Sequence, residues 1–586
     1  MIRLAFLPFL TLVLGAYQTT DSPQDSTVVS RPISSETTSS TPTPPANRKR
    51  FAATYYTTAV KRALTMLARI HYTSPTSIAD YEQRVIHSLI SKLDPSGILL
   101  TEDDLAQLGE PGFTFQAVQK SGDIGALDGA IDNIVEALRK NLALLTDPAD
   151  APPALSREWQ AQMQPYISAL AEAGYSQADI NTAIVEHVQY LDNRLASLSV
   201  QQRYHIILNA FAQAIDSHSR YIPPEGATHF QAIAPVSNQP EHQLGIGLNL
   251  INNNTHVFVE QVTRNTYSTR PVVPGTEILA IMDNTRPQLL WGLDLDAIDA
   301  MLAGTVDSAV PLLVKQNNTV EEITFYRVSP PTAKNTPQVD IIKANDAHTV
   351  DAAVLAIPSF YAGMSEYVES ELHKLQQAGI SRLVIDLRNN GGGSLNEATS
   401  LTGLFTGGGP VFQMKDPTGK VFVRNSTNTE MAFTGDLLVL VNAATAGGSE
   451  IFAAAIQDYQ RGVVLGTSTF GYGTIQQHRA LDRIYDVSDV SMGSMQFTIA
   501  TFYRVTGAST QLKGVTPDIP LTTVEPWLQR EGDSLYALEW EQIKSATYEK
   551  KKAIAERVNT IQRFASKTTN LPDDAMAAAI AIVKAY

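Results

Sequence analysis

The chain has 586 residues, of which 44% are hydrophobic and 18% charged, so it is long enough to form several globular domains with sizeable cores. Its net charge of −15 argues against nucleic acids and anionic membrane surfaces as main partners. The sequence contains no cysteine, which excludes disulfides, thiolate metal sites and a cysteine nucleophile.

The first 50 residues predict export followed by a linker. An apolar run from Leu4 to Leu14 follows a single arginine and precedes small residues, which is the pattern of a secretory signal peptide over residues 1–16. The run is too short to span a membrane comfortably, and no cysteine follows it that could carry a lipid. Residues 17–50 are rich in Ser, Thr and Pro and predict a disordered linker. We therefore expect a periplasmic or secreted protein with no membrane span.

Residues 51–235 predict a helical N-terminal domain, because apolar residues such as Val60, Leu64 and Leu67 recur at helical spacing. Its last predicted helix, residues 204–215, leads into the string DSHSRYIPP. Asp216 and His218 in that string invite a catalytic or metal-binding role. A single histidine in a turn after a helix is more often a capping or packing residue, and we favour that interpretation.

Residues 236–330 predict a β module. Five short apolar stretches separated by glycine turns are typical of strands, and a helical stretch at residues 294–302 lies between the third and the fourth. The first stretch contains Leu244, Gly245, Ile246 and Gly247. Glycines at such a turn leave backbone N–H groups free to bind a ligand.

Residues 331–525 alternate buried strands with helices. AAVLAIPSF, SRLVIDLR, LLVLVN and GVVLG are nearly continuous apolar runs, and amphipathic helical patterns lie between them. Such runs predict a largely parallel sheet covered on both faces. Residues 526–586 predict a short helical C-terminal region, with helix expected from Leu535 onward.

Two short segments carry a resemblance to a known family. Residues 445–450 read TAGGSE and residues 470–476 read FGYGTIQ. They resemble the S-A-S-A-S-E-I-F loop and the F-G-K-G-T-x-Q turn of the C-terminal processing (tail-specific) serine peptidases. In that family the third loop residue is the nucleophilic Ser and the turn supplies a Lys base. The corresponding residues here are Gly447 and Tyr472, separated by 472 − 447 = 25 positions, the spacing expected of the family.

The resemblance implies a multidomain α+β protein. The helical N-terminal domain would be followed by a PDZ-like module at residues 236–330 and an α/β peptidase core of the ClpP/crotonase type at residues 331–525. The strings IDLRNNGGGSLNEA and FYRVTGASTQLKGVTPDI also resemble the family. By the same resemblance, Leu244–Gly247 would be the loop that binds a peptide C-terminal carboxylate, with the next strand accepting the peptide by β-augmentation.

The remaining chemistry is implied by the same resemblance. Backbone N–H groups of Gly391, Gly392, Gly393 and Gly448 are candidates for an oxyanion hole, and Gln476 matches the glutamine that orients the Lys base. Both halves of the dyad are missing, because glycine has no side chain and a phenol has an ordinary pKa of about 10.

Three other residues are candidates to replace a member of the lost dyad. Ser449 is either a relocated nucleophile or, as we favour, an N-cap of the following helix. Thr445 is a weaker candidate nucleophile, and Lys513 is not expected to replace the base.

We therefore expect a peptidase homologue that binds polypeptide C-termini or unfolded proteins without cutting them, with an active paralogue or an adaptor as a candidate partner. One alternative is an active serine endopeptidase that uses Ser449, and another is a relic with a structural role only. No metal or cofactor is expected.

Overall fold

The computed structural model divides the chain into two units, residues 1–51 and residues 52–586. The structure describes residues 46–74, 77–108, 112–146, 152–224, 245–253, 255–262, 266–283, 286–328, 336–342, 352–428, 430–483, 486, 491–521, 525, 527–567 and 574–585. The predicted signal peptide and residues 17–45 of the predicted linker lie outside these ranges. The last five residues of that linker instead open the first helix, since Ala46, Arg48, Lys49 and Arg50 are strong helix formers.

In the described residues of the N-terminal part there are eight helices: α1 (Ala46–Ile70), α2 (Ile78–Leu93), α3 (Glu102–Leu108), α4 (Phe115–Ser121), α5 (Gly125–Thr146), α6 (Pro153–Glu172), α7 (Gln177–Ala196) and α8 (Val200–Gln213). The helical prediction is confirmed here, although α8 begins four residues before the predicted Tyr204. Ser199 and Gln202 form a capping box that starts the helix at this earlier point.

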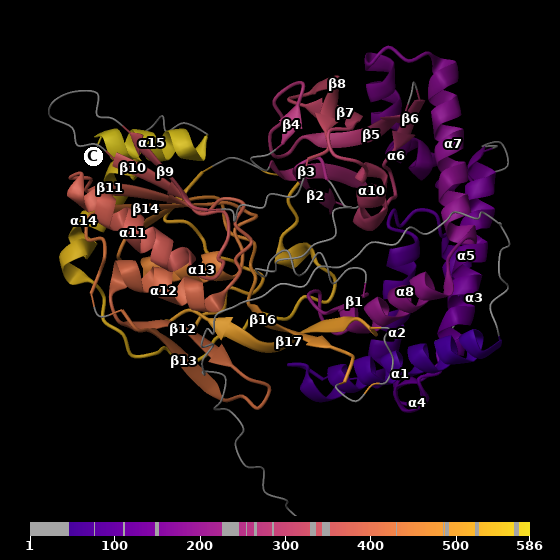
Figure 1. Cartoon of the computed structure of the whole chain (residues 1–586), viewed down its shortest axis with the longest axis horizontal. Coiled ribbons are helices and arrows are strands. Elements are labelled where there is room, and N and C mark those ends of the chain that lie inside the picture. Colours follow the sequence, from indigo (N-terminus) through magenta and orange to yellow (C-terminus); the bar gives the residue numbers. More distant parts are fainter. Residues whose placement is uncertain are drawn as a thin grey trace, which may run out of the picture. The chain divides into compact units, whose positions relative to one another are not determined.

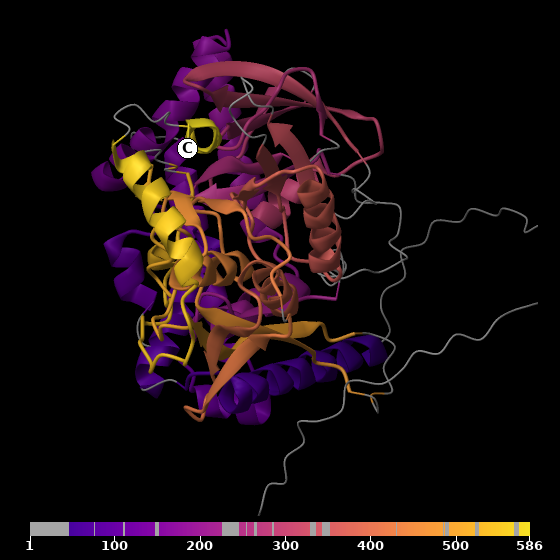
Figure 2. The ribbon, with the colours of Figure 1, turned by 90° about the vertical axis from the view of Figure 1, so that its left-hand side faces the viewer.

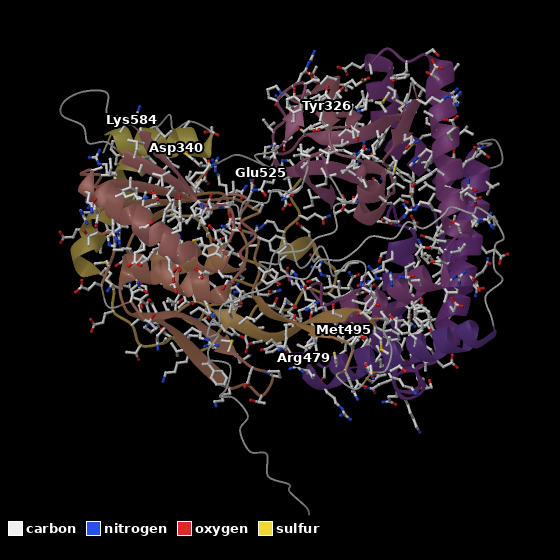
Figure 3. The ribbon with its side chains drawn as sticks, in the orientation of Figure 1. Tyr326, Asp340, Arg479, Met495, Glu525 and Lys584 are labelled. Atoms are coloured by element: carbon white, nitrogen blue, oxygen red, sulfur yellow. The ribbon has the colours of Figure 1, made fainter. Side chains whose placement is uncertain are left out.

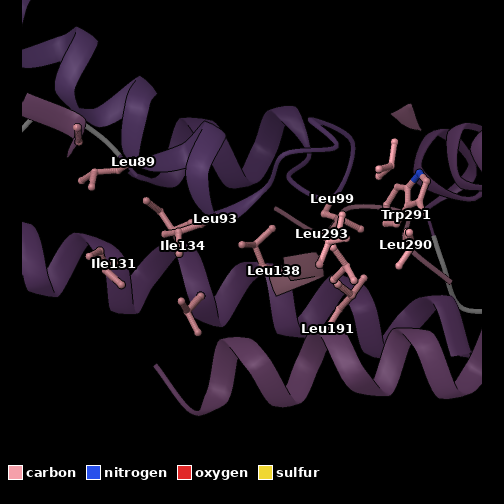
Figure 4. Close-up of a cluster of buried hydrophobic side chains, with 14 of the residues drawn as sticks. Leu89, Leu93, Leu99, Ile131, Ile134, Leu138, Leu191, Leu290, Trp291 and Leu293 are labelled. Atoms are coloured by element: carbon pink, nitrogen blue, oxygen red, sulfur yellow. The ribbon is translucent and has the colours of Figure 1, made fainter. Parts of the chain in front are cut away.

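The helices pack through the apolar stripe that the sequence pattern predicts. Figure 4 shows Leu89, Ile131, Ile134 and Leu138 among the buried side chains of this cluster. The same cluster extends to Trp291 of the β module, whose side chain is fully buried, and His187 of α7 lies 2.8 Å from the Trp291 carbonyl oxygen. The helices and the β module therefore share one core.

The β module is a seven-stranded sheet with one helix (Figure 1), so the five predicted strands and the helix are present, together with two short strands that the sequence pattern did not predict. It consists of β2 (Leu248–Asn253), β3 (His256–Val262), β4 (Tyr267–Ser268), β5 (Glu277–Asp283), β6 (Arg286–Leu289), α10 (Leu295–Leu302), β7 (Ala309–Gln316) and β8 (Thr319–Tyr326). The strand order is β2-β3-β5-β7-β8-β4, with β6 paired to β5, so β2 is an edge strand. Asp294 caps α10, and the helix lies against β2.

The α/β core is built on a six-stranded sheet of order β18-β15-β14-β11-β10-β9. Its strands are β9 (Gln338–Ile342), β10 (Ala352–Ala356), β11 (Arg382–Asp386), β14 (Asp436–Val441), β15 (Val463–Gly466) and β18 (Ile519–Pro520). All neighbouring pairs are parallel except β9 with β10, which confirms the predicted, largely parallel sheet.

Helices cover both faces of this sheet. Alternate strand residues such as Leu383 and Val439 pack against α11 (Met364–Gln377), α12 (Leu395–Thr406) and α13 (Gly448–Asp458). The residues between them, such as Val384 and Leu440, pack against α14 (Lys552–Lys567) and α15 (Ala575–Ala585). Figure 2 shows α14 and α15 in yellow. The alternation explains why these strands read as continuous apolar runs.

A second sheet in this part contains five strands: β1 (Arg220–Ile222), β12 (Gly409–Lys415), β13 (Val421–Ser426), β16 (Thr474–Ala480) and β17 (Ser494–Tyr503). Arg479 of β16 pairs with Met495 of β17 (Figure 3). Strand β1 follows the last N-terminal helix and pairs with β17, so the segment that contains Asp216 and His218 lies directly before a strand of this second sheet.

The C-terminal prediction is wrong for residues 535–551. Helix begins only at Lys552, after a single 3-10 turn at Glu531–Asp533. The intervening backbone is hydrogen-bonded to the loop after β17: Ser509 donates to Glu541, and Ile543 donates to Gly507. These tertiary bonds replace the local bonds of a helix. Among the residues described, no helix combines the length and the apolarity needed to cross a membrane.

Candidate functional site

Two loops meet at the carboxyl ends of parallel strands β11 and β14. Asn389 donates its backbone N–H to Asn442 Oδ1, and the Asn442 amide donates back to Asn389 Oδ1 at 2.7 Å. Ala446 donates its backbone N–H to the Asn390 carbonyl oxygen at 2.9 Å. The loop after β11 therefore holds the loop that contains the predicted nucleophile position, Gly447.

Gly447 has a backbone conformation that few other residues tolerate. Its φ is 56° and its ψ −115°, and it forms the N-cap of α13 directly after the loop that follows β14. A sharp strand-to-helix turn of this kind is where nucleophile elbows present a serine. A Cβ placed on Gly447 would lie 3.5 Å from the Gly391 carbonyl oxygen, which is an ordinary contact. The turn has room for a serine side chain, but the chain has none there.

Tyr472, at the predicted base position, is largely buried just before β16. Its ring lies 4.2 Å from that of His218, centroid to centroid. Burial raises the pKa of Tyr472 well above its ordinary value, and the charges of Asp216 and Glu531 add to this, while hydrogen bonding from Thr474 and Gln476 opposes it. A phenol with a raised pKa stays protonated at neutral pH and cannot act as a base.

Gln476 lies beside Tyr472, and its side chain hydrogen-bonds two threonines. Its amide nitrogen donates to Thr474 Oγ1 at 3.0 Å and to Thr498 Oγ1 at 2.8 Å. Its Oε1 is buried and has no hydrogen-bond partner in the described part of the chain. The glutamine that would orient a Lys base is thus retained, with one acceptor unused.

Glu450 joins the two segments that would carry the dyad. It is fully buried and accepts hydrogen bonds from the backbone of Gly447, Gly471 and Tyr472 and from the Thr469 hydroxyl. Burial raises the pKa of Glu450 to about 7, although the four hydrogen bonds favour the ionised form. The geometry of the site is therefore maintained by a residue that is neither nucleophile nor base.

The four oxyanion-hole candidates differ in availability. Gly392 donates its N–H to Asn390 Oδ1 at 2.8 Å, so this group is already used. Gly391 and Gly448 donate to no acceptor within the described ranges, and Gly391 lines the cavity described below. Gly393 forms a β-bridge with Phe360, and its Cβ position is blocked by the Phe360 carbonyl oxygen. The N–H groups of Gly391 and Gly448 are therefore the better candidates.

Adding a single methyl group at Gly392 should lower the stability of the fold strongly. A Cβ there would lie 2.7 Å from the Gly448 nitrogen and 2.8 Å from the Ala446 carbonyl oxygen, and φ is +94°. We expect Gly392→Ala to lower the free energy of unfolding by about 2–4 kcal/mol, because backbone must move and a positive φ is forced on alanine. Gly391→Ala is the control, since nothing lies within 4 Å of its Cβ position. Equal urea midpoints for the two variants would contradict the close approach of the loops.

A cavity of about 220 Å³ lies at this site. Gly391, Ala444 and Ala446 contribute from the two loops, and His218, Phe470 and Tyr472 line it as well. The β module contributes Ile251 and Glu260, and the segment after the core contributes Leu528 and Gln529. Because the loops, the β module and the C-terminal segment all contribute, a ligand bound here would contact three parts of the chain.

His218 lines the cavity and its ring packs against that of Tyr472, so the packing role favoured above stays a prediction. Its Nε2 lies 2.6 Å from a carboxylate oxygen of Glu531, which is fully buried. Glu531 also accepts from the Gln511 amide, and Gln511 in turn accepts the N–H of Gly473, next to Tyr472. No local pattern could have revealed this, because His218 and Glu531 are 313 residues apart. Asp216, in contrast, is buried and bonded to His71, a structural role.

The alternative residues for the dyad are poorly placed. Ser449 is fully buried, and its hydroxyl has no hydrogen-bond partner among the described residues, so its predicted N-cap role is wrong: Gly447 holds that position. The Thr445 hydroxyl is buried and donates to the Leu387 carbonyl oxygen. The Lys513 ammonium lies 3.6 Å from the centre of the Trp540 ring, and Lys513 does not line the cavity.

The predicted peptide-binding loop is described from Gly245 onward, and Leu244 lies outside the described residues. Gly245 forms a β-bridge with Val328, and Ile246 is buried in the module. Gly247 has a φ of 77°, and its carbonyl oxygen accepts from the Thr266 hydroxyl. The loop leads into β2, which is an edge strand of the sheet among the residues that the structure describes.

Comparison with known proteins gives one family match and several relatives. Residues 351–521 match Peptidase family S41. The chain is 29% identical over 521 residues to the tail-specific protease of Haemophilus influenzae, covering 84% of this chain and 74% of that protein. It is 26% identical over 310 residues to a probable CtpA-like serine protease of Staphylococcus epidermidis, covering 53% of this chain and 58% of the relative.

Among solved structures, the photosystem II D1 C-terminal processing protease matches with a TM-score of 0.43 and 19% identity. The match covers 62% of this chain and 92% of that one.

Proposed function

Because this chain belongs to peptidase family S41, we propose that it is a peptidase-like protein that binds polypeptide C-termini and does not cleave them. The observation that carries the proposal is Gly447, a residue without a side chain in the turn where a nucleophile would stand. The base position is occupied by Tyr472, whose raised pKa keeps the phenol protonated. Loss of a nucleophile and its base leaves only a small remnant of rate enhancement.

The binding surfaces do not depend on the dyad. Strand β2 is an edge strand and lies against α10, where the Asn252 amide donates to the Leu293 carbonyl oxygen. The loop through Gly245 and Gly247 leads into this edge. In peptide recognition by β-augmentation, the edge strand provides main-chain hydrogen bonds and the loop before it binds the terminal carboxylate. The cavity beside Gly391 and Ala446 extends this surface toward the site.

The proposed setting is outside the cytoplasm. The signal-peptide pattern of residues 1–16 and the acidic net charge support an exported protein that acts on polypeptides rather than nucleic acids. An active paralogue or an adaptor protein would be a partner of such a binding protein.

The test combines cleavage with binding. The purified chain should not hydrolyse unfolded proteins or peptides with apolar C-termini, and it should not react with serine-directed phosphonates. Fluorescent peptides with a free apolar C-terminus should bind about 10-fold more tightly than the same peptides with a C-terminal amide, because a charged carboxylate hydrogen-bonds more strongly than a neutral amide. Gly245→Val should reduce this difference by hindering the approach of a carboxylate to the backbone.

Two outcomes would contradict the proposal in different ways. Cleavage above the blank that Ser449→Ala abolishes would support the alternative, an active endopeptidase with a relocated nucleophile. Equal affinities for the acid and the amide would remove C-terminal recognition. Absence of both cleavage and peptide binding would leave the third interpretation, a protein with structural value only.

A further inference from the structure

Glu260 brings an unpaired carboxylate to the cavity. The residue lies on β3 and lines the cavity together with Gly391 and Ala446, the neighbours of the lost nucleophile. Its side chain is half-buried, and in the part of the chain that the structure describes it has no hydrogen-bond or ion-pair partner. Burial raises the pKa of Glu260. A carboxylate removed from water without a partner is costly, so its presence in a cavity points to a ligand that supplies one.

Glu260 interrupts the regular pairing of β2 with β3. Leu250 pairs with Val259 and Asn249 with Gln261, so Glu260 is an extra residue without a partner on β2. An extra residue of this kind is a β-bulge, which redirects the side chain it carries and is frequent beside active sites. The neighbouring Val259 stays fully buried in the module. The bulge therefore presents Glu260 to the cavity without disturbing the core.

The rest of the cavity suits a long side chain with a cationic end. Ile251 and Leu528 pack together with Ala444 and offer an apolar wall. Tyr472 adds an aromatic face. Of the other ionisable side chains that line it, Tyr472 stays protonated and His218 is already hydrogen-bonded to Glu531. The charge of Glu260 therefore has no counterpart among the described residues that line the cavity. An apolar cavity of roughly 150 Å³ can hold a benzene molecule, and this one measures about 220 Å³.

We propose that this cavity binds a lysine or arginine side chain of the polypeptide, with the Glu260 carboxylate as its ion-pair partner. The methylene groups would lie along Ile251 and Leu528, as long basic side chains do on apolar surfaces. The pair would form in a partly dehydrated position, where an ion pair is stronger than at an open surface. This inference rests on the proposed function, since it requires that polypeptides enter the site, and it adds a selective position at some distance from the terminal carboxylate.

The experiment measures binding of matched peptides to the full chain by fluorescence polarisation. Each peptide has the same free apolar C-terminus and a single lysine at one of several internal positions, and its partner has norleucine at that position. At one position or more, the lysine peptide should bind about 10-fold more tightly than the norleucine peptide. In Glu260→Gln the ratio should fall to about 1, and Glu260→Asp should keep part of it. Glu322→Gln, an exposed charge on β8 of the same module, should leave the ratio unchanged.

The results separate this inference from the proposed function. A lysine-to-norleucine ratio near 1 at every position, or a ratio that survives in Glu260→Gln, would overturn the basic-side-chain site. In that case a preference for the free C-terminus over the amide would leave the proposed function standing. If no peptide binds, both fail together. Charge reversal by Glu260→Lys should favour peptides with glutamate at the selected position, and the absence of such a reversal would also count against the ion pair.

Discussion

A double variant, Gly447→Ser with Tyr472→Lys, should cleave unstructured polypeptides at least about 100-fold faster than the unmodified chain, and neither single variant should. A working dyad is worth several orders of magnitude in rate, so partial recovery would already be measurable. The supporting parts are present: Glu450 joins the two segments, Gln476 has an unused acceptor, and the N–H of Gly448 is available. Release of a fluorescent product from a quenched peptide measures the gain.

The structure also predicts why recovery should be partial. Serine at position 447 must adopt a φ near 56°, which costs about 1–3 kcal/mol, although its Cβ has room. Lysine at position 472 would be buried, which lowers its pKa, but the nearby acids Asp216 and Glu531 would raise it. Because only the neutral amine acts as a base, the rate should rise with pH.

The matched control is Gly447→Ala with Tyr472→Lys. It carries the same Cβ and the same backbone strain but no hydroxyl, so it should stay at the background rate. Cleavage by this control would show that the nucleophile lies elsewhere. A folded double variant without activity would mean that the site differs from a working one beyond the two dyad positions, for example at the threonines that hydrogen-bond Gln476.

Much of the fold follows from local patterns in the sequence. The strands of the parallel sheet are nearly continuous apolar runs, and the helices between them have clear periodicity, so both were predictable. The segment 535–551 was not, because several of its backbone hydrogen bonds are made with residues 505–509 in the loop after β17. A segment whose hydrogen bonds are mostly tertiary carries no periodic signal.

Some residues of the candidate site could likewise be predicted from the sequence, and others could not. Gly447 and Tyr472 were identified because each stands inside a short string with a fixed spacing. His218, Glu531 and Glu260 come from three different parts of the chain and meet only in the folded structure. The bulge that presents Glu260 depends on how β2 and β3 pair, which no run of side chains in either strand reveals.

The largest loss of stability should come from Asp216→Ala. Asp216 is buried and bonded to the buried His71, and it also accepts the backbone N–H groups of His218 and Ser219 at 2.7 and 2.8 Å. Removing one partner of a buried pair leaves the others without an acceptor and costs about 3–5 kcal/mol. Unfolding in urea measures the loss. Asp192→Asn is the control, because its ion pair with Arg139 is exposed and should be worth less than about 1 kcal/mol.

Asp216 should also make the stability of the folded chain depend on pH. Burial alone would raise the pKa of Asp216, but hydrogen bonding and charge from His71, with the charge of His218 and a hydrogen bond from Thr498, lower it below the ordinary 3.8. The folded state therefore binds fewer protons than the unfolded state between the two values. The stabilisation is complete above pH 3.8 and is lost as the pH falls through the folded pKa. The unmodified chain should thus lose stability more steeply below about pH 4 than Asp216→Ala does.

Asp216 also has a consequence for the site, because it fixes the backbone from which His218 reaches the cavity. Asp216→Asn keeps the size of the side chain and one acceptor oxygen, so part of the stability should remain while the position of His218 changes. We expect this milder variant to stay folded at neutral pH but to bind C-terminal peptides more weakly than Asp192→Asn does. If both variants bind peptides equally well, His218 is not part of the binding surface, and the cavity is defined by the loops and the β module alone.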